Sequence, residues 1–539
     1  MFKSFGWIKC ILFIWLTLLL AVFYCPRIQL HTADLGRHIK NGEILFTQHK
    51  LVSTNFYSYT EPQYSAINHH WASGAVFYLM WKCAGFYGLS LFYMMILLLA
   101  FGIVFFSAVR FSNFWVVLFY SVLCMPLIVT RLEIRPEGFS FLFLTIMFSL
   151  LWFDYKKKLP SGWIWIIVLL QVLWVNFHIY FIFGPVLVGA FLINKFIDRD
   201  WRGAPAHIYL LLAVMFACLI NPYGLKGAIE PFNIFREYGY MLVENQTVLF
   251  MQKRFPQIGT YLYFEIVFGI AVFIWLLSVI SKFFKKYIAL FVIFLFFSLI
   301  AWKMIRGIHV WGLIAIPILS AITYDWLLCQ KMKIIRVVLT FMAVLGVTGL
   351  AVGSITRETI YSPYNRSFLS VLVPESVQGW WFPKVIAKFG ILPGTVPGAD
   401  LAADFFKNNR LQGPIFNNYD IGGYLIYHLF PERVFVDNRP EAYSVEFFQD
   451  LFVPMQEDEN KWREIDSKYH FNVIFFYRHD LTPWGQPFLI KRINDPQWAP
   501  VFVDGYTLIL LKRNWVNQDL IKKYELPKSM FGAQKNIGE

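Results

Sequence analysis

Residues 11–23 read ILFIWLTLLLAVF, and a polar segment follows at residues 33–71, ADLGRHIKNGEILFTQHKLVSTNFYSYTEPQYSAINHHW. An apolar helix can cross lipid because it bonds its backbone amides internally. The polar segment that comes next carries the ionisable residues Asp34, His38, Glu43, His69 and His70. In a chain this apolar, we expect the segment to be an outer loop that forms one wall of an active site.

Hydrophobic residues make up 58% of the 539 positions and charged residues only 15%, far from the composition of soluble proteins. About eleven apolar runs are long enough to be spans. They are 10–26, 86–109, 113–130, 138–153, 162–178, 180–197, 206–220, 261–281, 287–302, 307–328 and 335–353. No small-residue cleavage site follows the first run, so we read it as a retained helix. The sequence predicts a polytopic α-helical membrane protein. The shorter apolar piece at 73–84 fits an interfacial helix.

The net charge of +14 is explained by membrane topology better than by nucleic-acid binding. Lys and Arg are dense in short loops at 110, 156–158, 195–202, 282–286 and 331–336. Such loops stay on the cytoplasmic side. We therefore expect an inner-membrane protein with its N-terminus in the cytoplasm and its C-terminal domain outside, surrounded by membrane lipids and with no nucleic-acid partner.

The composition changes after residue 353 and divides the chain. We expect a transmembrane domain at 1–353 with outer loops at 28–72 and 221–260, a juxtamembrane connection at 354–398, a soluble α/β domain at 399–513 and a polar tail at 514–539. Strands are predicted at 414–416, 434–436, 473–477 and 507–511, and helices at 402–409, 443–452 and 461–469. The six cysteines form no CxxC pair and indicate neither a disulfide framework nor a zinc site.

Polar residues of the membrane half gather at helix ends on the predicted outer side. They include Arg131, Arg135, Glu137, Asn176, His178, Glu244, Lys303 and Arg306. Guanidinium groups suit a lipid phosphate or pyrophosphate, because they donate paired, charge-assisted hydrogen bonds. The alternative is that these side chains reach ordinary phospholipid headgroups. For Asn176 we favour a capping role.

Within the first loop, Asp34 lies close enough to the first span to remain near the bilayer surface. A carboxylate there could accept the proton of an attacking sugar hydroxyl. A solvated loop acid, or a cap for a helix from Leu35 to Asn41, is the alternative. The adjacent His69 and His70 cannot easily face one metal ion, so a divalent metal would need further ligands. Asp34, Glu43 or Glu137 could supply them, but no spacing in the sequence supports such a site. Trp71 fits an interface anchor or a sugar platform equally well.

Two segments of the soluble domain each follow a predicted strand, NNYDIGGY at 417–424 and VDNRPE at 436–441. Ligands of α/β sheets bind at such strand ends. The paired glycines do not make a dinucleotide fingerprint. We interpret Asp437 and Arg439 as a structural ion pair.

The assembled residues resemble the GT-C membrane glycosyltransferases that use polyprenyl-phosphate sugars. The Asp34-x-x-Arg37 start of the loop, its Ile39-x-x-Gly42 continuation and its His70-Trp71 close are similar to the lipid-linked aminoarabinose and protein O-mannosyl transferases. The resemblance implies a polyprenyl-phosphate sugar as donor and a lipid, glycan or protein as acceptor, with no certain cofactor.

On this resemblance Asp34 is the catalytic base. The donor phosphate is held by Arg131, Arg135, Lys303 and Arg306. Candidate acceptor or sugar contacts are Arg37, His38, His69, His70, Trp71, Glu137, Asn176 and His178. Two other hypotheses stay open: a non-catalytic scaffold whose outer domain binds a partner, and a transporter. The second is disfavoured because few ionisable residues fall within the spans.

Overall fold

The computed structural model describes residues 6–160, 162–233, 238–256, 258–329, 342 and 393–531. The predicted span at 335–353, apart from Met342, and most of the predicted connection at 354–398 lie outside the described residues. The chain divides into two compact units. The helical unit comprises Met1–Arg27, Tyr87–Pro231 and Leu242–Gly394, and the mixed unit comprises Ile28–Phe86, Phe232–Met241 and Thr395–Glu539.

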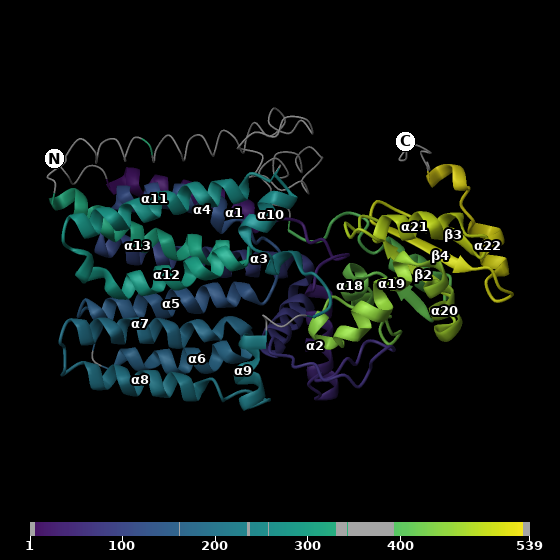
Figure 1. The fold of residues 1–539 in the computed structure, drawn as a ribbon, viewed down its shortest axis with the longest axis horizontal. Coiled ribbons are helices and arrows are strands. Elements are labelled where there is room, and N and C mark those ends of the chain that lie inside the picture. The colour runs from purple at the N-terminus through teal and green to yellow at the C-terminus, as the bar shows by residue number, and fades with distance from the viewer. Residues whose placement is uncertain are drawn as a thin grey trace. The chain divides into compact units, whose positions relative to one another are not determined.

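Long apolar helices lie side by side in the helical unit (Figure 1). They are α1 (Gly6–Tyr24), the second part of α3 (Trp71–Phe111), α4 (Phe114–Ile128), α5 (Glu137–Tyr155), α6 (Ile166–Phe177), α7 (Phe183–Ile197), α8 (Ala204–Ala217), α11 (Thr260–Ile280), α12 (Ile288–Lys303) and α13 (Gly307–Cys329). Among the described residues, seven helical segments have the length and composition to cross a membrane, and three shorter apolar ones accompany them. Every residue from Gly307 to Thr323 of α13 is buried, and this helix packs against α4 and α12.

Short elements connect these helices. They are η1 (Trp163–Trp165), η2 (Ile179–Ile182), α9 (Leu225–Asn233), η3 (Val243–Asn245), α10 (Val248–Arg254) and η4 (Phe284–Tyr287). Helix α3 breaks at Gly85, whose φ of 60° is a left-handed conformation that favours glycine. Residues 71–84, which include the segment predicted to be interfacial, therefore form a separate helical piece in the mixed unit.

A four-stranded sheet organises the mixed unit, with strand order β1-β2-β4-β3. Its strands are β1 (Ile415–Asn417), β2 (Val473–Tyr477), β3 (Trp498–Val503) and β4 (Thr507–Lys512). Strand β1 runs parallel to β2, and the other two pairs are antiparallel.

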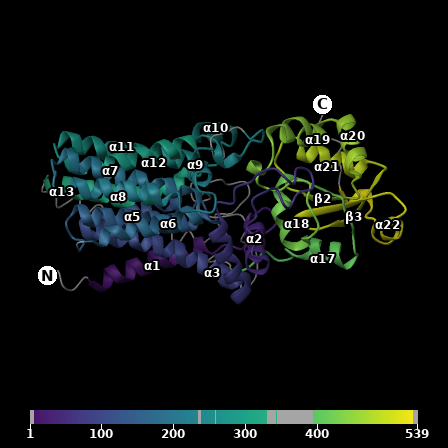
Figure 2. The ribbon, with the colours of Figure 1, turned by 90° about the horizontal axis from the view of Figure 1, so that it is seen from below.

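Helices cover both faces of this sheet. Figure 2 shows α17 (Leu401–Asn408) and α18 (Gly422–Leu429) on one side of β2 and β3, and α20 (Glu459–Tyr469) and α21 (Gly485–Asn494) on the other. Successive side chains of a strand point to opposite faces. Accordingly, Phe475 packs against Phe406 and Tyr424, whereas Phe476 packs against Phe488 of α21. The remaining elements are η6 (Tyr419–Ile421), η7 (Pro440–Ala442), η8 (Phe447–Phe452), α19 (Pro454–Glu457), α22 (Gln518–Tyr524) and η9 (Lys528–Phe531).

The prediction of a strand at 434–436 is wrong. The backbone there is extended, but Val434 forms only an isolated bridge with Ser58 of the first loop. The Asn417 side chain accepts a hydrogen bond from the Phe435 amide and donates one to the Val436 carbonyl. These contacts satisfy the backbone without a neighbouring strand. The helix predicted at 443–452 is confined to the π-helical turn η8, and β3, α18 and α21 were not predicted.

Helix α2 (Leu35–Gln48) begins directly after Asp34 and is held by glycine contacts on two sides. A Cβ on Gly42 would lie 2.3 Å from the carbonyl oxygen of Gly74 in the first part of α3. A Cβ on Gly36 would lie 2.8 Å from the carbonyl oxygen of Gly423 in α18. The first loop is therefore built into the same core as the C-terminal residues.

Candidate functional sites

Three arginines of the helical unit surround one carboxylate. Arg131 and Arg135 lie in the loop between α4 and α5, Arg306 lies between α12 and α13, and Glu244 belongs to η3. Glu244 Oε2 accepts from Arg131 Nη2 at 2.9 Å and from Arg135 Nη1 at 3.0 Å, and Arg306 Nη1 is 3.6 Å from Glu244 Oε1. We call these four residues the arginine cluster.

The backbone fixes this convergence as well as the side chains do. The Ile305 amide donates to the Gln246 carbonyl at 3.0 Å, and the Arg306 amide donates to the Glu244 carbonyl at 3.4 Å. Burial alone would raise the pKa of the Glu244 carboxyl, but the positive charges of Arg131, Arg135 and Arg306 hold that pKa well below its usual range. Glu244 is therefore an anion at neutral pH.

The three arginines of the cluster differ in how closely carboxylates hold them. Arg131 also makes a two-pronged bond to Glu137, with Nε–Oε1 at 2.7 Å and Nη2–Oε2 at 3.2 Å, and Arg135 bonds Glu133 at 2.7 Å. Arg306 is held more loosely, because its shortest carboxylate contact is 3.6 Å and its buried Nε has no hydrogen-bond partner among the described residues. The cluster thus keeps a donor available for a further anion.

The remaining predicted residues of this unit have other surroundings. Lys303 is the last residue of α12, directly before the short loop that carries Arg306. The Asn176 amide donates to the carbonyl groups of Val172, within α6, and of Ile220, just after α8, at 2.8 and 2.9 Å. His178 is buried, and its Nδ1 lies 2.8 Å from the Ser140 hydroxyl, which also accepts from the Trp174 indole.

In the mixed unit, Asp34 occupies the N-cap position of α2 without a side-chain capping bond. Its carboxylate lies 3.4 Å from Arg37 Nη2, one turn later on the same helix. The Asp34 side chain keeps 20% of its exposure and Arg37 only 7%, so the acid is accessible while its partner is enclosed. This arrangement presents a carboxylate at the start of a helix.

The predicted histidines and Trp71 lie along the same helix and its neighbour. The rings of His69 and His70 are 4.0 Å apart, and His70 lies edge-on to the buried His38 of α2 at 5.6 Å. Trp71 starts α3. Within the part of the chain that the structure describes, no group of three or more His, Cys, Asp or Glu side chains is arranged to hold a metal ion.

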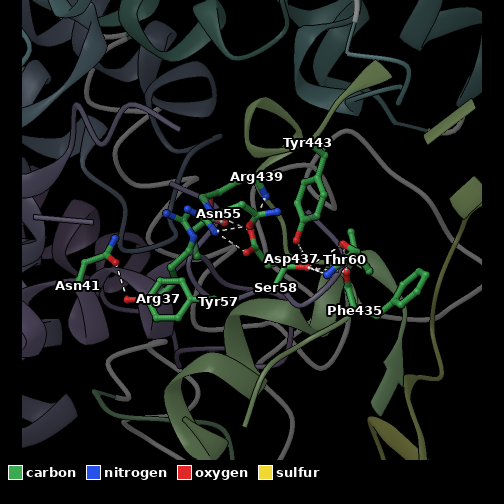
Figure 3. Close-up of polar contacts among 12 residues, drawn as sticks. Arg37, Asn41, Asn55, Tyr57, Ser58, Thr60, Phe435, Asp437, Arg439 and Tyr443 are labelled. Carbon is green, nitrogen blue, oxygen red and sulfur yellow. Dashed lines mark hydrogen bonds and ion pairs between the residues drawn. The ribbon is translucent and has the colours of Figure 1, made fainter. Parts of the chain in front are cut away.

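Next to α2, the segment at 434–444 lies along the first loop. Figure 3 shows Arg439 between Asp437 and Asn55. Arg439 makes two bonds to Asp437, at 2.8 and 2.6 Å, and a third to the Asn55 carbonyl oxygen at 3.1 Å. The Asp437 side chain is fully buried. The pair expected from the sequence thus also ties the first loop to the C-terminal residues.

Sequence reasoning assigned no role in a site to Glu244, Glu441 or Tyr419. Glu244 was recognised only as one polar residue on the outer side, because nothing local reveals its pairing with Arg131 and Arg135, more than 100 positions earlier, or with Arg306. Glu441 and Tyr419 lie in the two segments singled out after predicted strands. The sequence feature that pointed to these segments was their position directly after a predicted strand.

No protein-family model matches the sequence, and a comparison with curated proteins found no match. Solved structures do resemble it. ArnT from Cupriavidus metallidurans bound to undecaprenyl phosphate aligns over 94% of this chain and 98% of its own, with a TM-score of 0.51 and 12% identity. Its apo structure gives 0.53 and 14% over the same shares. The archaeal oligosaccharyltransferase AglB from Archaeoglobus fulgidus, in complex with an inhibitory peptide and a dolichol-phosphate, gives 0.56 and 11% over 94% of this chain and 74% of its own.

This is the GT-C fold. The resemblance seen in the first-loop motifs is therefore confirmed at the level of the fold. The predicted class, a polytopic α-helical membrane protein with a C-terminal α/β domain, is confirmed as well, although the number of eleven spans is not.

Proposed function

We propose that the protein is a membrane glycosyltransferase that moves one sugar from a polyprenyl-phosphate donor to a lipid, glycan or protein acceptor. The observation that carries the proposal is the arginine cluster, which gathers three guanidinium groups at helix ends in a chain with the GT-C fold. The neighbour ArnT is described as bound to undecaprenyl phosphate, a ligand of the chemistry that such a cluster suits.

In this proposal the cluster stabilises the leaving group. Arg306 has a buried donor without a partner among the described residues and the loosest carboxylate contact, so it is the arginine best placed to donate a hydrogen bond to a phosphate oxygen. Arg131 and Arg135 add positive charge, and Lys303 supplies a further cation close by in the chain. Negative charge grows on the lipid phosphate as the sugar departs, and fixed cations lower the energy of that transition state.

Asp34 is proposed as the general base. It takes the proton of the acceptor hydroxyl while that oxygen attacks the anomeric carbon. The bond from the anomeric carbon to the phosphate oxygen breaks, and its electron pair leaves with the lipid phosphate. Direct displacement inverts the anomeric centre. Arg37 Nη2 lies 3.4 Å from the Asp34 carboxylate and can hold it in place for this role.

We also propose an inner-membrane location with the N-terminus in the cytoplasm and the mixed unit outside. The support is the density of Lys and Arg in the short loops at 110, 156–158, 195–202 and 282–286.

The test is turnover of a panel of radiolabelled undecaprenyl-phosphate sugars by detergent-purified protein. Asp34→Asn should abolish transfer without loss of lipid-phosphate binding, whereas Arg306→Gln should weaken that binding. Asp450→Asn changes an exposed acid of the mixed unit, which also contains Asp34, and serves as the control for Asp34→Asn. If Asp34→Asn transfers as fast as wild type, Asp34 is not the base. Absence of binding across the whole panel would favour the scaffold hypothesis, in which changes between Asp437 and Tyr443 impair function more than Asp34→Asn does.

A further inference from the structure

A second carboxyl group of the mixed unit, that of Glu441, lies within electrostatic range of Arg37, the partner of Asp34. Glu441 belongs to the short turn η7, which follows the buried Asp437–Arg439 pair. Burial raises the pKa of the Glu441 carboxyl, and the nearby positive charge of Arg37 opposes that rise only in part. Glu441 thus favours the neutral acid more than an ordinary surface carboxyl does.

Other residues of the mixed unit also approach the start of α2. Tyr419 of η6 lies within electrostatic range of both Glu441 and Asp34. A Cβ on Gly423 would lie 2.9 Å from the Ala33 carbonyl oxygen and 3.4 Å from Asn438 Oδ1, so Gly423 of α18 lies against both the Asn438 side chain and the chain just before Asp34. The residues around the start of α2 are Arg37, Tyr419, Asn438 and Glu441, which we call the α2-end cluster.

Polar atoms of this cluster lack partners. Arg37 Nε, Tyr419 Oη and Asn438 Oδ1 are buried with no hydrogen bond to any described residue. Arg37 and Tyr419 are each only 6% exposed. Buried polar groups in native proteins are nearly always bonded, because leaving one unmet costs its desolvation energy. Two donors and an acceptor on segments that meet around the start of α2 are therefore suited to a ligand that both donates and accepts.

The charges around the cluster decide which ligand fits. Arg37 is balanced by Asp34, and Arg439 by Asp437. Burial disfavours the charge on Glu441. The atoms left to meet a ligand are Arg37 Nε, Tyr419 Oη and Asn438 Oδ1, and hydroxyl groups, which donate and accept at once, match them.

An aromatic surface adjoins these polar atoms. The ring of Tyr240 stacks on Tyr419 with centroids 4.4 Å apart, and Tyr240 also contacts Phe448 at 5.1 Å. Aromatic walls with a few placed polar groups are usual in small-molecule sites. A sugar ring offers both components, a band of C–H groups and a rim of hydroxyls.

We propose that the α2-end cluster binds the hydroxyl groups of an uncharged sugar ring beside Asp34. The inference rests on the proposed function for its substrate class and extends it, since it assigns sugar recognition to residues of the C-terminal part of the chain. Tyr419 Oη and Arg37 Nε donate to ring hydroxyls, and Asn438 Oδ1 accepts from one.

The test compares two probes, undecaprenyl phosphate and undecaprenyl-phosphate glucose, by equilibrium binding to the full-length protein in detergent. Wild type should bind the glycosylated lipid more tightly than the bare one. Tyr419→Phe should weaken glycosylated-lipid binding by roughly 5-fold, the effect of one neutral hydrogen bond, and leave bare-lipid binding unchanged. Arg306→Gln should weaken both. Tyr64→Phe, at an exposed tyrosine of the same unit, is the matched control.

The melting temperature of Tyr419→Phe distinguishes a loss of sugar binding from a loss of stability. The Tyr419 hydroxyl has no partner among the described residues, so its removal should leave the melting temperature unchanged or raise it. A lowered melting temperature in Tyr419→Phe, with equal losses for both probes, would show a structural role and overturn the proposal.

A third arm uses neutral oligosaccharides without lipid. It distinguishes an acceptor sugar from a donor sugar, because only an acceptor site binds glycans that carry no phosphate. If the protein binds no undecaprenyl phosphate at all, the proposed function fails. Oligosaccharide binding lost in Tyr419→Phe would still support the cluster, and absence of any sugar-dependent binding by either route would refute it.

Discussion

Gly36 of α2 and Gly423 of α18 meet with no room for a side chain between them. A Cβ on Gly36 would lie 2.8 Å from the Gly423 carbonyl oxygen and 2.8 Å from the Tyr427 Cβ, both closer than Cβ contacts normally come. One glycine belongs to the first loop and the other to the GGYL segment, nearly 400 positions later. Their contact sets the distance between the helix that Asp34 starts and the C-terminal residues.

Gly36→Ala should therefore destabilise the mixed unit. The neighbouring atoms are backbone and Cβ, which cannot turn aside, so the helices must separate at a cost of about 1–3 kcal/mol. Thermal unfolding of purified protein measures the effect. Gly505→Ala is the control, because a Cβ there meets nothing within 4 Å. Equal melting temperatures for the two variants would contradict this account of the contact.

The membrane helices could be predicted from sequence because their signal is local. A span needs only a continuous apolar run, and ten of the expected spans coincide with helices of the structure. The segment at 434–436 had the composition of a strand, but Asn417 and the first loop, which are distant in sequence, supply its hydrogen bonds. The composition of the segment cannot reveal that distant residues, and not a neighbouring strand, bond its backbone.

The candidate sites show the same division. Residue type and position at helix ends indicated Arg131, Arg135 and Arg306. Their shared contact with Glu244 depends on how three separate loops fold together. Likewise, the segment containing Glu441 was identified by its place after a predicted strand, but its approach to Arg37 depends on how α2 and α18, which are distant in sequence, pack against each other.

Arg439→Met should destabilise the protein strongly. The substitution keeps much of the side-chain volume but leaves the fully buried Asp437 without its two-pronged partner. Breaking a buried ion pair on one side typically costs about 3–5 kcal/mol. Chemical denaturation gives the change in unfolding free energy. Arg463→Met removes an exposed partner of Glu459 and should cost no more than about 1 kcal/mol. A loss for Arg439→Met as small as that of the control would mean that the buried pair does not hold the first loop.

Glu244→Gln should strengthen lipid-phosphate binding. The Glu244 carboxylate occupies guanidinium donors of Arg131 and Arg135 that a phosphate oxygen would otherwise use, and its charge opposes an incoming anion. Removing the charge while keeping the shape should lower the dissociation constant for undecaprenyl phosphate several-fold at pH 7 and low salt. Glu133→Gln is the comparison, because Glu133 contacts only Arg135 in the cluster and is half exposed. Weaker binding in Glu244→Gln would show that Glu244 organises the arginines and does not compete for them.

His31 should make the mixed unit sensitive to mild acid. Its ring is fully buried between Tyr424 and Tyr506, with centroids 4.7 and 4.5 Å away, and neither ring nitrogen has a hydrogen-bond partner among the described residues. Burial lowers the pKa of His31 to about 4, although the negative charge of Asp504 acts in the opposite direction. The unfolded chain takes up this proton near pH 6.5 and the folded chain does not. The His31 contribution is thus complete above pH 6.5, and as the pH falls from 6.5 to 4 stability declines by up to about 1.4 kcal/mol per pH unit.

His31→Phe keeps the aromatic stack and should flatten the dependence of the unfolding free energy on pH in that window. His470→Asn, at an exposed histidine, should leave it as steep as in wild type. An unchanged slope in His31→Phe would show that the proton is taken up elsewhere.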